Sequence, residues 1–330
     1  GHLGNVLVRE LLAEGERVRV LVYPGEDTRA LADLQVETVY GDVRNPEAVA
    51  EAVKGVDSVF HMAGIVAIVS DHPELLEAVN VQGTRNIVEA CIAGGVRRLV
   101  YTSSIHALQD IPHGTVIDEK IPFDPVNAVG AYGKSKAKAS LAVLDGVSRG
   151  LDAVICCPTG VYGPYDFRPS RTGRLLLNAF VKGRQSLPEG SYDFVDVRDI
   201  ARGEILAWRH GGRGETYILA GEKLSLGTMV KLIQKIVGRK VSVFRIPMWL
   251  CKLASKFIYL RYRLTGKEPL VTAESLSIVR SNCTITSRKA EREIGYTHRT
   301  AADTVRDTID WFRRIGKLLP EAGGRRRRGV

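Results

Sequence analysis

Three side chains, Ser104, Tyr132 and Lys136, have the types and the spacing needed to move a proton to or from a carbonyl oxygen. Tyr132 and Lys136 are four residues apart on a predicted helix, so they share one face. A phenol with an ordinary pKa of about 10 becomes a usable acid or base when a neighbouring ammonium lowers that pKa. Ser104 follows a predicted strand and is placed to hydrogen-bond the same oxygen. Alone, Tyr-x-x-x-Lys is a weak signal, because most such pairs lie on protein surfaces.

The elements that must position these residues alternate between strand and helix. Strands are predicted at 17–22, 36–40, 58–61, 98–102 and 153–157, and helices at 46–53, 75–93 and 131–147. This alternation predicts an α/β fold with a doubly wound, Rossmann-like parallel sheet that helices cover on both faces. Ligands of such sheets bind beyond the carboxyl ends of the strands. Asp42, His61, Ser103, Ser104 and Pro158 all fall at those ends.

The chain opens with Gly1-His2-Leu3-Gly4, directly before a helical pattern that starts at Asn5. Two glycines at a helix start let backbone N–H groups approach a pyrophosphate, whose charge the helix dipole favours. Flexible chain ends are the alternative, and these residues alone do not decide between the two. A phosphate-binding turn normally follows a strand, and no strand precedes this one.

The composition is that of a globular protein. The chain has 330 residues, of which 45% are hydrophobic and 25% charged, and this excludes disorder as its main character. Five cysteines without a C-x-x-C pair predict neither a disulfide framework nor a zinc site, and no metal is expected. Cys156 and Cys157 lie in an apolar run and are predicted to be buried thiols, which fits a reducing cytoplasm. The segment 246–260 is broken by two lysines and predicts an amphipathic core helix, with a membrane-surface helix as the alternative.

The net charge of +10 is unevenly distributed. Four positive charges lie in Arg325–Arg328, which leaves +6 for the rest of the chain. We expect the basic tail to be a disordered, solvated end, with a nucleic-acid or anionic-membrane contact as the alternative. The remaining charge is compatible with an anionic ligand such as a phosphorylated cofactor.

Ordered motifs cover nearly the whole chain. They are Gly1-x-x-Gly4, Gly41-Asp42-Val43, His61-Met62-Ala63-Gly64, Asn80-Val81-Gln82-Gly83-Thr84, Tyr101-Thr102-Ser103-Ser104, Tyr132-Gly133-Lys134-Ser135-Lys136, Pro158-Thr159-Gly160-Val161-Tyr162-Gly163-Pro164 and Phe194 to Ala201. With these motifs the sequence resembles the extended short-chain dehydrogenase/reductases of the NAD-dependent epimerase/dehydratase superfamily. The resemblance implies an NAD(P)-dependent enzyme that acts on a small-molecule carbonyl or alcohol.

By this resemblance, Tyr132 is the general acid/base, Lys136 lowers its pKa and holds the nicotinamide ribose, and Ser104 polarises the substrate oxygen. The implied cofactor-binding residues are Gly1, Gly4, Tyr23, Asp42, Val43, His61, Ala63, Gly64, Tyr132, Lys136, Pro158 and Val161. Simpler roles exist for some of them: Asp42 as a turn residue and His61 as a satisfied strand-end histidine. We interpret Asn80 as a structural residue whose amide fixes a neighbouring backbone.

Two departures from the family pattern affect the cofactor. The first strand and first turn glycine are absent, which predicts a truncated chain that binds the cofactor poorly. NAD-dependent members generally place an acid at the end of the second strand, where this chain has Val22-Tyr23-Pro24-Gly25 and no acid until Glu26. The missing acid favours NADP over NAD, although Arg29 is the only basic residue found nearby.

The Pro-Thr form of segment 157–164 resembles dihydroflavonol reductases and 3β-hydroxysteroid dehydrogenases, which act on bulky apolar molecules. Segments 246–250, 264–266 and 269–272 support the same branch more loosely. Nucleotide-sugar epimerisation or dehydration is the rival activity, because Arg168, Arg171 and Arg174 could hold a diphosphate. A non-catalytic dinucleotide sensor is the rival from another class.

The expected architecture has a dinucleotide-binding domain over 1–160 and a substrate lobe over 161–320. Segment 193–220 is expected to return to the sheet, and 321–330 to form the tail. Family members often dimerise through two helices of each subunit, which makes a homodimer the state to test. No nucleic-acid partner is expected, and a membrane-surface contact is the less favoured alternative.

Overall fold

The structure is a computed structural model and describes residues 1–66, 73–181, 184–238, 242–251, 253–254, 276 and 282–318. The segments 264–266 and 269–272, and the basic tail over 321–330, lie outside the described residues. The expectations for these segments therefore stay predictions.

A parallel four-stranded sheet forms the centre of the molecule, in the strand order β3 (Ser58–His61), β4 (Arg98–Thr102), β5 (Ala153–Pro158) and β9 (Thr216–Leu219). A second parallel sheet pairs β1 (Arg19–Val22) with β2 (Glu37–Tyr40). Strand β5 is buried along its whole length, as a strand covered on both faces should be. Cys156 and Cys157 lie on it as buried thiols, as predicted.

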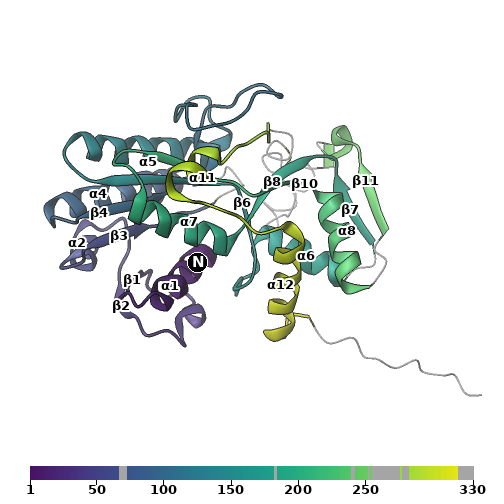
Figure 1. The fold of residues 1–330 in the computed structure, drawn as a ribbon, viewed down its shortest axis with the longest axis horizontal. Coiled ribbons are helices and arrows are strands. Elements are labelled where there is room, and N and C mark those ends of the chain that lie inside the picture. The colour runs from purple at the N-terminus through teal and green to yellow at the C-terminus, as the bar shows by residue number, and fades with distance from the viewer. Residues whose placement is uncertain are drawn as a thin grey trace, which may run out of the picture.

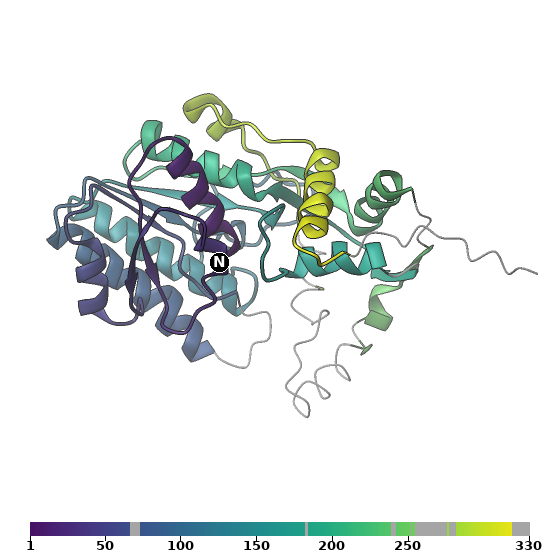
Figure 2. The same cartoon turned by 90° about the horizontal axis from the view of Figure 1, so that it is seen from below.

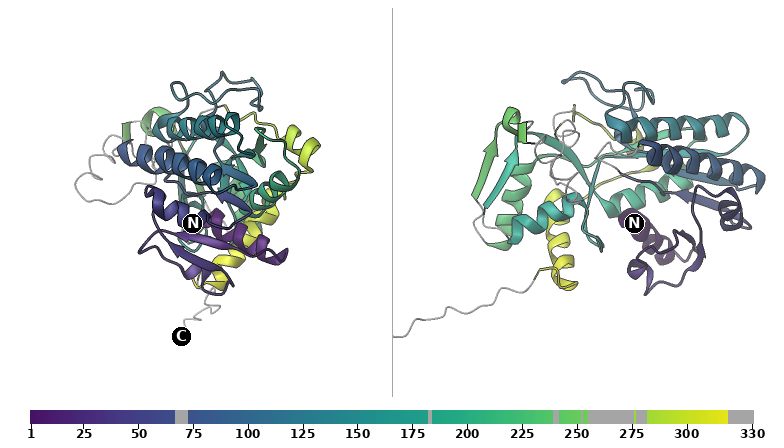
Figure 3. Two further views of the ribbon diagram at one scale, coloured as in Figure 1. Left: turned by 90° about the vertical axis from the view of Figure 1, so that its left-hand side faces the viewer. Right: turned by 180° about the vertical axis from the view of Figure 1, so that it is seen from behind.

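Helices cover both faces of the sheet (Figure 1). On one face, α5 (Gly130–Ser148) packs on α4 (Gly83–Ala93), which in turn contacts α2 (Pro46–Val53); Figure 3 shows α4 and α5 side by side. On the other face, α7 (Val197–His210) packs on β4 and β5 and contacts α1 (His2–Ala13) and α11 (Arg288–Ile294). The predicted doubly wound Rossmann-like α/β fold is confirmed.

Local chemistry explains where several helices begin. Asn45 caps α2 by accepting a hydrogen bond from the Ala48 N–H at 2.9 Å, and Pro46 occupies the first helical position. Asp196 caps α7 in the same way through the Arg198 N–H. The helix predicted over 75–93 is more complex, because α3 (Pro73–Leu76) passes through a π-helical stretch (Glu77–Gln82) before α4 begins. Such stretches often occur at functional sites.

The C-terminal half adds a second group of elements. A three-stranded sheet has the order β10 (Glu222–Ser225), β8 (Ser191–Asp196) and β6 (Gly160–Tyr162), and β7 (Arg184–Pro188) pairs with β11 (Ser242–Ile246). Helices α6 (Arg171–Val181), α8 (Leu226–Val237) and α12 (Ala301–Arg314) pack among these strands, and Figure 2 shows α12 beside α6. Strand β9 returns to the central sheet and pairs with β5. The domain boundaries themselves stay a prediction.

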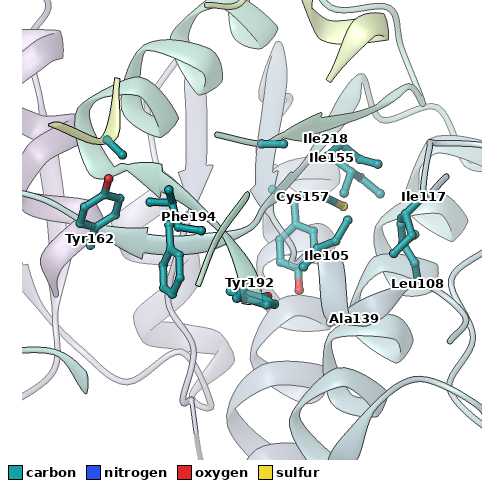
Figure 4. Packing of buried hydrophobic residues seen from close by; sticks show 14 of the residues in the cluster. Ile105, Leu108, Ile117, Ala139, Ile155, Cys157, Tyr162, Tyr192, Phe194 and Ile218 are labelled. Carbon is teal, nitrogen blue, oxygen red and sulfur yellow. The ribbon is translucent and has the colours of Figure 1, made fainter. Parts of the chain in front are cut away.

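The two groups share one hydrophobic core. One cluster of buried side chains contains residues of β5, β6, β8, β9, α5 and the segment after β4, and Figure 4 labels ten of them: Tyr162, Phe194, Tyr192, Cys157, Ile105, Ala139, Ile155, Ile218, Leu108 and Ile117. This continuity fixes β8 against the carboxyl ends of the central strands. The catalytic candidates lie at those ends.

The segment predicted as a core helix over 246–260 is described only in part. Residues 248–251 are helical, but the Trp249 side chain is 68% exposed and Leu250 is also exposed. These two side chains therefore do not pack in the core, which is contrary to the prediction for this part of the segment. None of the described helices is both long and apolar enough to cross a membrane.

Candidate active site

Ser104 and Tyr132 come together at the carboxyl end of β4. Ser104 caps a short 3-10 helix, η3 (Ile105–Ala107), and its Oγ accepts a hydrogen bond from the His106 N–H at 3.2 Å. Tyr132 lies in the first turn of α5, where the Ser104 hydroxyl hydrogen-bonds its phenol. That hydrogen bond lowers the pKa of Tyr132, but burial outweighs it and raises the pKa to about 12.

Lys136 is buried one turn further along α5. Its Nζ donates a hydrogen bond to the Thr102 carbonyl oxygen at 2.6 Å and lies 4.4 Å from the centre of the Tyr101 ring. Burial lowers the pKa of Lys136 to about 7. The sequence predicted that this ammonium lowers the pKa of Tyr132, whereas burial dominates here and raises it. The reason is geometric, because the amine is turned to the strand end instead of the phenol.

Buried polar side chains form hydrogen bonds within the segments that carry Ser104 and Lys136. Ser103 and Ser140 share a hydrogen bond of 2.7 Å between their hydroxyls, and Ser140 donates to the Lys136 carbonyl oxygen at 2.8 Å. The Thr102 hydroxyl donates to Glu204 Oε1 of α7 at 2.6 Å. The sequence analysis singled out neither Ser140 nor Glu204, because both contacts join segments far apart in the chain.

The N-terminal glycines, for which the sequence predicted a phosphate contact, lie at the start of α1. Gly1 is the N-cap and no side chain caps the helix, so its first-turn N–H groups are available to an anion. Asn5 Nδ2 donates to the Gly1 and His2 carbonyl oxygens, and His2 Nε2 donates to the Pro164 carbonyl oxygen at 2.8 Å. A Cβ added at Gly4 would lie 4.0 Å from Met62 Sδ, which brings two predicted cofactor segments together.

The segment that follows β3 is held by two buried side chains. Thr84 donates its hydroxyl proton to the Asn80 carbonyl oxygen at 2.6 Å, so His61 Nε2, 2.9 Å from Thr84 Oγ1, is the donor of that contact. Burial lowers the pKa of His61 to about 3, which keeps the imidazole neutral. In this structure His61 is therefore a buried strand-end histidine with a hydrogen-bond partner, which was the simpler of the two predicted roles. Ala63 and Gly64 are exposed and accessible to a ligand.

Asn80 fixes this segment as the sequence analysis interpreted it. Its Oδ1 accepts from the Ile65 N–H at 2.8 Å and its Nδ2 donates to the Ile65 carbonyl oxygen at 3.0 Å. The same Nδ2 donates to Ser135 Oγ of α5 at 2.9 Å. One buried amide of the π-helical stretch thus joins the segment after β3 to the helix that carries Tyr132 and Lys136.

Replacing Asn80 with Ala should destabilise the protein, because the Ile65 backbone groups lose both partners. We expect the free energy of unfolding to fall by about 1–3 kcal/mol, and urea denaturation measures the change. Gln82→Ala is the matched control, since Gln82 is an exposed amide in the same stretch that contacts Asn86. Equal losses in the two variants would contradict a structural role specific to Asn80.

The remaining predicted cofactor residues lie at strand ends or close to them. Tyr23 follows β1 and is exposed, and Asp42 follows β2, where its Oδ1 accepts from the Arg44 N–H at 2.9 Å. Asp42 also forms an ion pair with the Arg44 side chain, which lowers the pKa of the Asp42 carboxyl. In this structure Asp42 therefore acts as a turn residue, which was the alternative to a contact with adenine. Val43 is half-buried, Pro158 ends β5, and Val161 on β6 packs in the apolar cluster of Leu3 and Phe60.

A second imidazole lies beside the catalytic candidates and was missed in the sequence. His106 Nε2 is 2.6 Å from Tyr192 Oη, and the two rings stack with their centres 5.6 Å apart. Burial lowers the pKa of His106 to about 4. The pair joins η3 to β8 and fixes the segment that carries Ser104. Its partners are 86 residues apart, so no local motif reveals it.

Comparison with known proteins shows the family of this chain. The sequence model of the 3-beta hydroxysteroid dehydrogenase/isomerase family matches residues 1–212. The chain belongs to this family. It is an NAD(P)-dependent enzyme of the extended short-chain dehydrogenase/reductase type, as the motifs predicted.

Similar proteins match over almost the full chain. Sterol demethylase protein B of Methylococcus capsulatus is 34% identical over 96% of this chain and 97% of its own length. A putative dihydroflavonol 4-reductase of Synechocystis is 29% identical over 96% of this chain and 93% of its own length. The UDP-glucose 4-epimerase of Thermus thermophilus, solved in complex with NAD, has a TM-score of 0.75 at 22% identity. The match covers 95% of this chain and 96% of that one, and it shows a common fold.

Proposed function

We propose that the protein is an oxidoreductase that transfers hydride between a nicotinamide dinucleotide and a ketone or secondary alcohol of a bulky, apolar small molecule. The observation that carries the proposal is the contact between the Ser104 and Tyr132 hydroxyls at the carboxyl end of the central sheet. Two hydroxyls that meet at one point give a substrate oxygen both a hydrogen-bond donor and a proton source.

In the proposed mechanism, the bound nicotinamide supplies or accepts the hydride. Ser104 donates a hydrogen bond to the substrate oxygen and orients it. Tyr132 gives its phenolic proton to that oxygen in reduction and takes the proton back in oxidation. The raised pKa of Tyr132 suits the donor role, because the phenol is fully protonated at neutral pH. Lys136 holds the nicotinamide ribose and contributes positive charge.

The start of α1 would hold the dinucleotide's pyrophosphate, with Gly1 and Gly4 leaving room for it. Ala63 and Gly64 would line the nicotinamide side, and Tyr23 and Asp42 the adenosine side. We favour NADP over NAD because no acid lies directly at the end of β1, where the first acid is Glu26. Arg29, the basic residue considered for the 2′-phosphate, is engaged by Asp27 through a bidentate ion pair. Arg44 is paired with Asp42 in the same way, but it also contacts Tyr23 at the end of β1, so we include it as a second candidate for that role.

Substituting Tyr23 with Asp should reverse the preference between nucleotides. An acid at the end of β1 can accept hydrogen bonds from ribose hydroxyls and repels a 2′-phosphate. We expect the ratio of NADPH affinity to NADH affinity to fall at least tenfold, a difference of about 1.4 kcal/mol, in fluorescence titrations. Tyr40→Asp is the control, since it adds the same charge to an exposed tyrosine at the end of β2. An unchanged ratio in Tyr23→Asp would place the nucleotide's ribose elsewhere.

The family name and the two relatives above support a steroid-like or flavonoid-like carbonyl substrate. Nucleotide-sugar conversion is less well supported, because Arg168, one of three arginines considered for a diphosphate, forms an ion pair with Glu26. A silent dinucleotide sensor would have no use for the contact between Ser104 and Tyr132.

The test is a titration with NADPH and NADH followed by a panel of steroid ketones, flavanones, aldehydes and nucleotide sugars. Stoichiometric oxidation of NADPH by an apolar ketone is the expected result. Conversion of a nucleotide sugar without net oxidation would replace the proposal with the epimerase activity. No binding of either nucleotide would overturn both.

A further inference from the structure

A pair of side chains, His106 and Tyr192, joins the segment that carries Ser104 to the second group of strands. His106 lies on η3, which follows the carboxyl end of β4, and Tyr192 lies on β8. His106 Nε2 is 2.6 Å from Tyr192 Oη. Tyr192 is 7% exposed, so loss of the imidazole would leave a buried hydroxyl without this partner. The mechanism above gives neither side chain a role.

The backbone of His106 contacts both segments that carry the catalytic hydroxyls. Its N–H donates to Ser104 Oγ at 3.2 Å and therefore occupies one of the two lone pairs of that oxygen. The hydroxyl proton of Ser104 remains available as a donor, which is the role that the proposed mechanism requires. The carbonyl group of His106 packs against Gly133, the residue after Tyr132, where an added Cβ would lie 3.3 Å from the carbonyl carbon. A movement of His106 would therefore change the direction of the Ser104 hydroxyl.

The Tyr192 ring is itself held in place on β8. A Cβ added at Gly160 of β6 would lie 2.8 Å from both Cδ1 and Cε1 of that ring, so the ring packs directly on the glycine backbone. The Phe194 ring meets it edge-on, with the two ring centres 5.6 Å apart, and Figure 4 labels both residues on β8. Because two neighbours restrict the ring, its hydroxyl is a fixed partner for the imidazole.

We propose that His106 and Tyr192 are positioning residues, which hold η3 so that the Ser104 hydroxyl faces the substrate oxygen. The inference rests on the proposed function, in which Ser104 donates a hydrogen bond to that oxygen. A donor assists catalysis most when it is fixed in place before the reaction, and a small displacement reduces the rate. The Tyr192 hydroxyl supplies this constraint from a strand 86 residues further along the chain.

The first test measures how firmly η3 is held, and it needs no substrate. The chain has seven histidines, so labelling with ¹⁵N-histidine gives few amide signals, and that of His106 is assigned by its absence in His106→Gln. Tyr192→Phe removes the hydroxyl and keeps the ring. We expect hydrogen exchange of the His106 amide to become about fivefold faster or more, as the loss of one buried hydrogen bond implies. The amide of His61 on β3 is the internal reference and should not change.

Tyr296→Phe is the matched control for the exchange measurement. Tyr296 is 1% exposed, and its hydroxyl donates to the Ala220 carbonyl oxygen at 2.9 Å, so this variant also loses one buried hydrogen bond. It should leave exchange of the His106 amide at the wild-type rate. Unchanged exchange in Tyr192→Phe, or an equal increase in the two variants, would overturn the inference.

The second test asks whether Tyr192 acts through Ser104. In the wild-type background, Tyr192→Phe should lower kcat by about tenfold and leave the affinity for NADPH unchanged. In the Ser104→Ala background the same substitution should have no further effect on kcat, because the hydroxyl that it positions is already gone. A general structural role would lower kcat equally in both backgrounds, and that result would contradict positioning.

A second pair of variants covers the case in which Tyr192→Phe does not fold. The amide nitrogen of glutamine can take the place of His106 Nε2, so His106→Gln should keep the contact with Tyr192 and most of kcat. His106→Leu has no polar atom there and should lose about tenfold in kcat; equal activity of the two would overturn the inference. The proposed function fails separately, when the wild-type enzyme reduces no carbonyl although exchange of the His106 amide responds as expected.

Discussion

Replacing Tyr132 with Phe will sharply reduce the rate of ketone reduction while leaving nucleotide binding close to that of the wild type. The substitution removes the phenolic proton and the hydrogen bond with Ser104, but it keeps the ring in its place at the start of α5. General acid catalysis by a positioned side chain contributes about 10²–10⁴-fold to a rate. We expect kcat to fall within that range, measured as NADPH oxidation with the best carbonyl of the panel.

Tyr162→Phe is the matched control for this experiment. Tyr162 is a tyrosine of β6 with 2% of its surface exposed, and its hydroxyl hydrogen-bonds Thr304, away from Ser104. Its replacement should cost about 1 kcal/mol of stability and leave kcat unchanged. If Tyr132→Phe retained wild-type turnover, the proton would come from another group, and the oxidoreductase mechanism proposed above would be wrong.

The fold was predictable because its strands carry their own signal. Apolar, β-branched runs mark β3, β4 and β5 in the sequence, and the observed bounds match the expected ones to within one residue. Helix α2 was equally clear, because Asn45 and Pro46 encode its start. Parallel order followed from the alternation with helices, which leaves few other connections.

The sequence named the candidate residues of the site but did not predict their pKa shifts. Those shifts depend on contacts between segments far apart in the chain, which no local pattern encodes. Tyr132 and Lys136 share a face, as their spacing requires, but the orientation of the amine depends on the Thr102 carbonyl oxygen. Glu204 is 102 residues from Thr102, and a lone glutamate in a helix gives no local sign of burial. The contacts that the sequence did not predict are those of buried polar groups, and functional sites are expected at such groups.

Gly133 lies where α5 approaches η3 most closely, and its replacement with Ala should affect both stability and, under the proposed mechanism, rate. Gly133 follows Tyr132 directly, and a Cβ there would clash with the carbonyl oxygen of His106 and lie 3.3 Å from its carbonyl carbon. His106 belongs to η3, which Ser104 caps. Because the obstructing atoms are backbone, α5 and η3 must move apart to admit the methyl group.

We expect Gly133→Ala to lower the free energy of unfolding by about 1–3 kcal/mol, as overpacking does. We also expect kcat to fall by about a hundredfold, since a displacement of about 1 Å between reacting groups has that effect. Gly227→Ala on α8 is the control, because the nearest atom to its added Cβ is Ser225 Oγ at 3.8 Å. Urea denaturation and NADPH oxidation measure the two effects. Reduced stability with full turnover would show that the Gly133 contact holds the helix without setting the spacing of Ser104 and Tyr132.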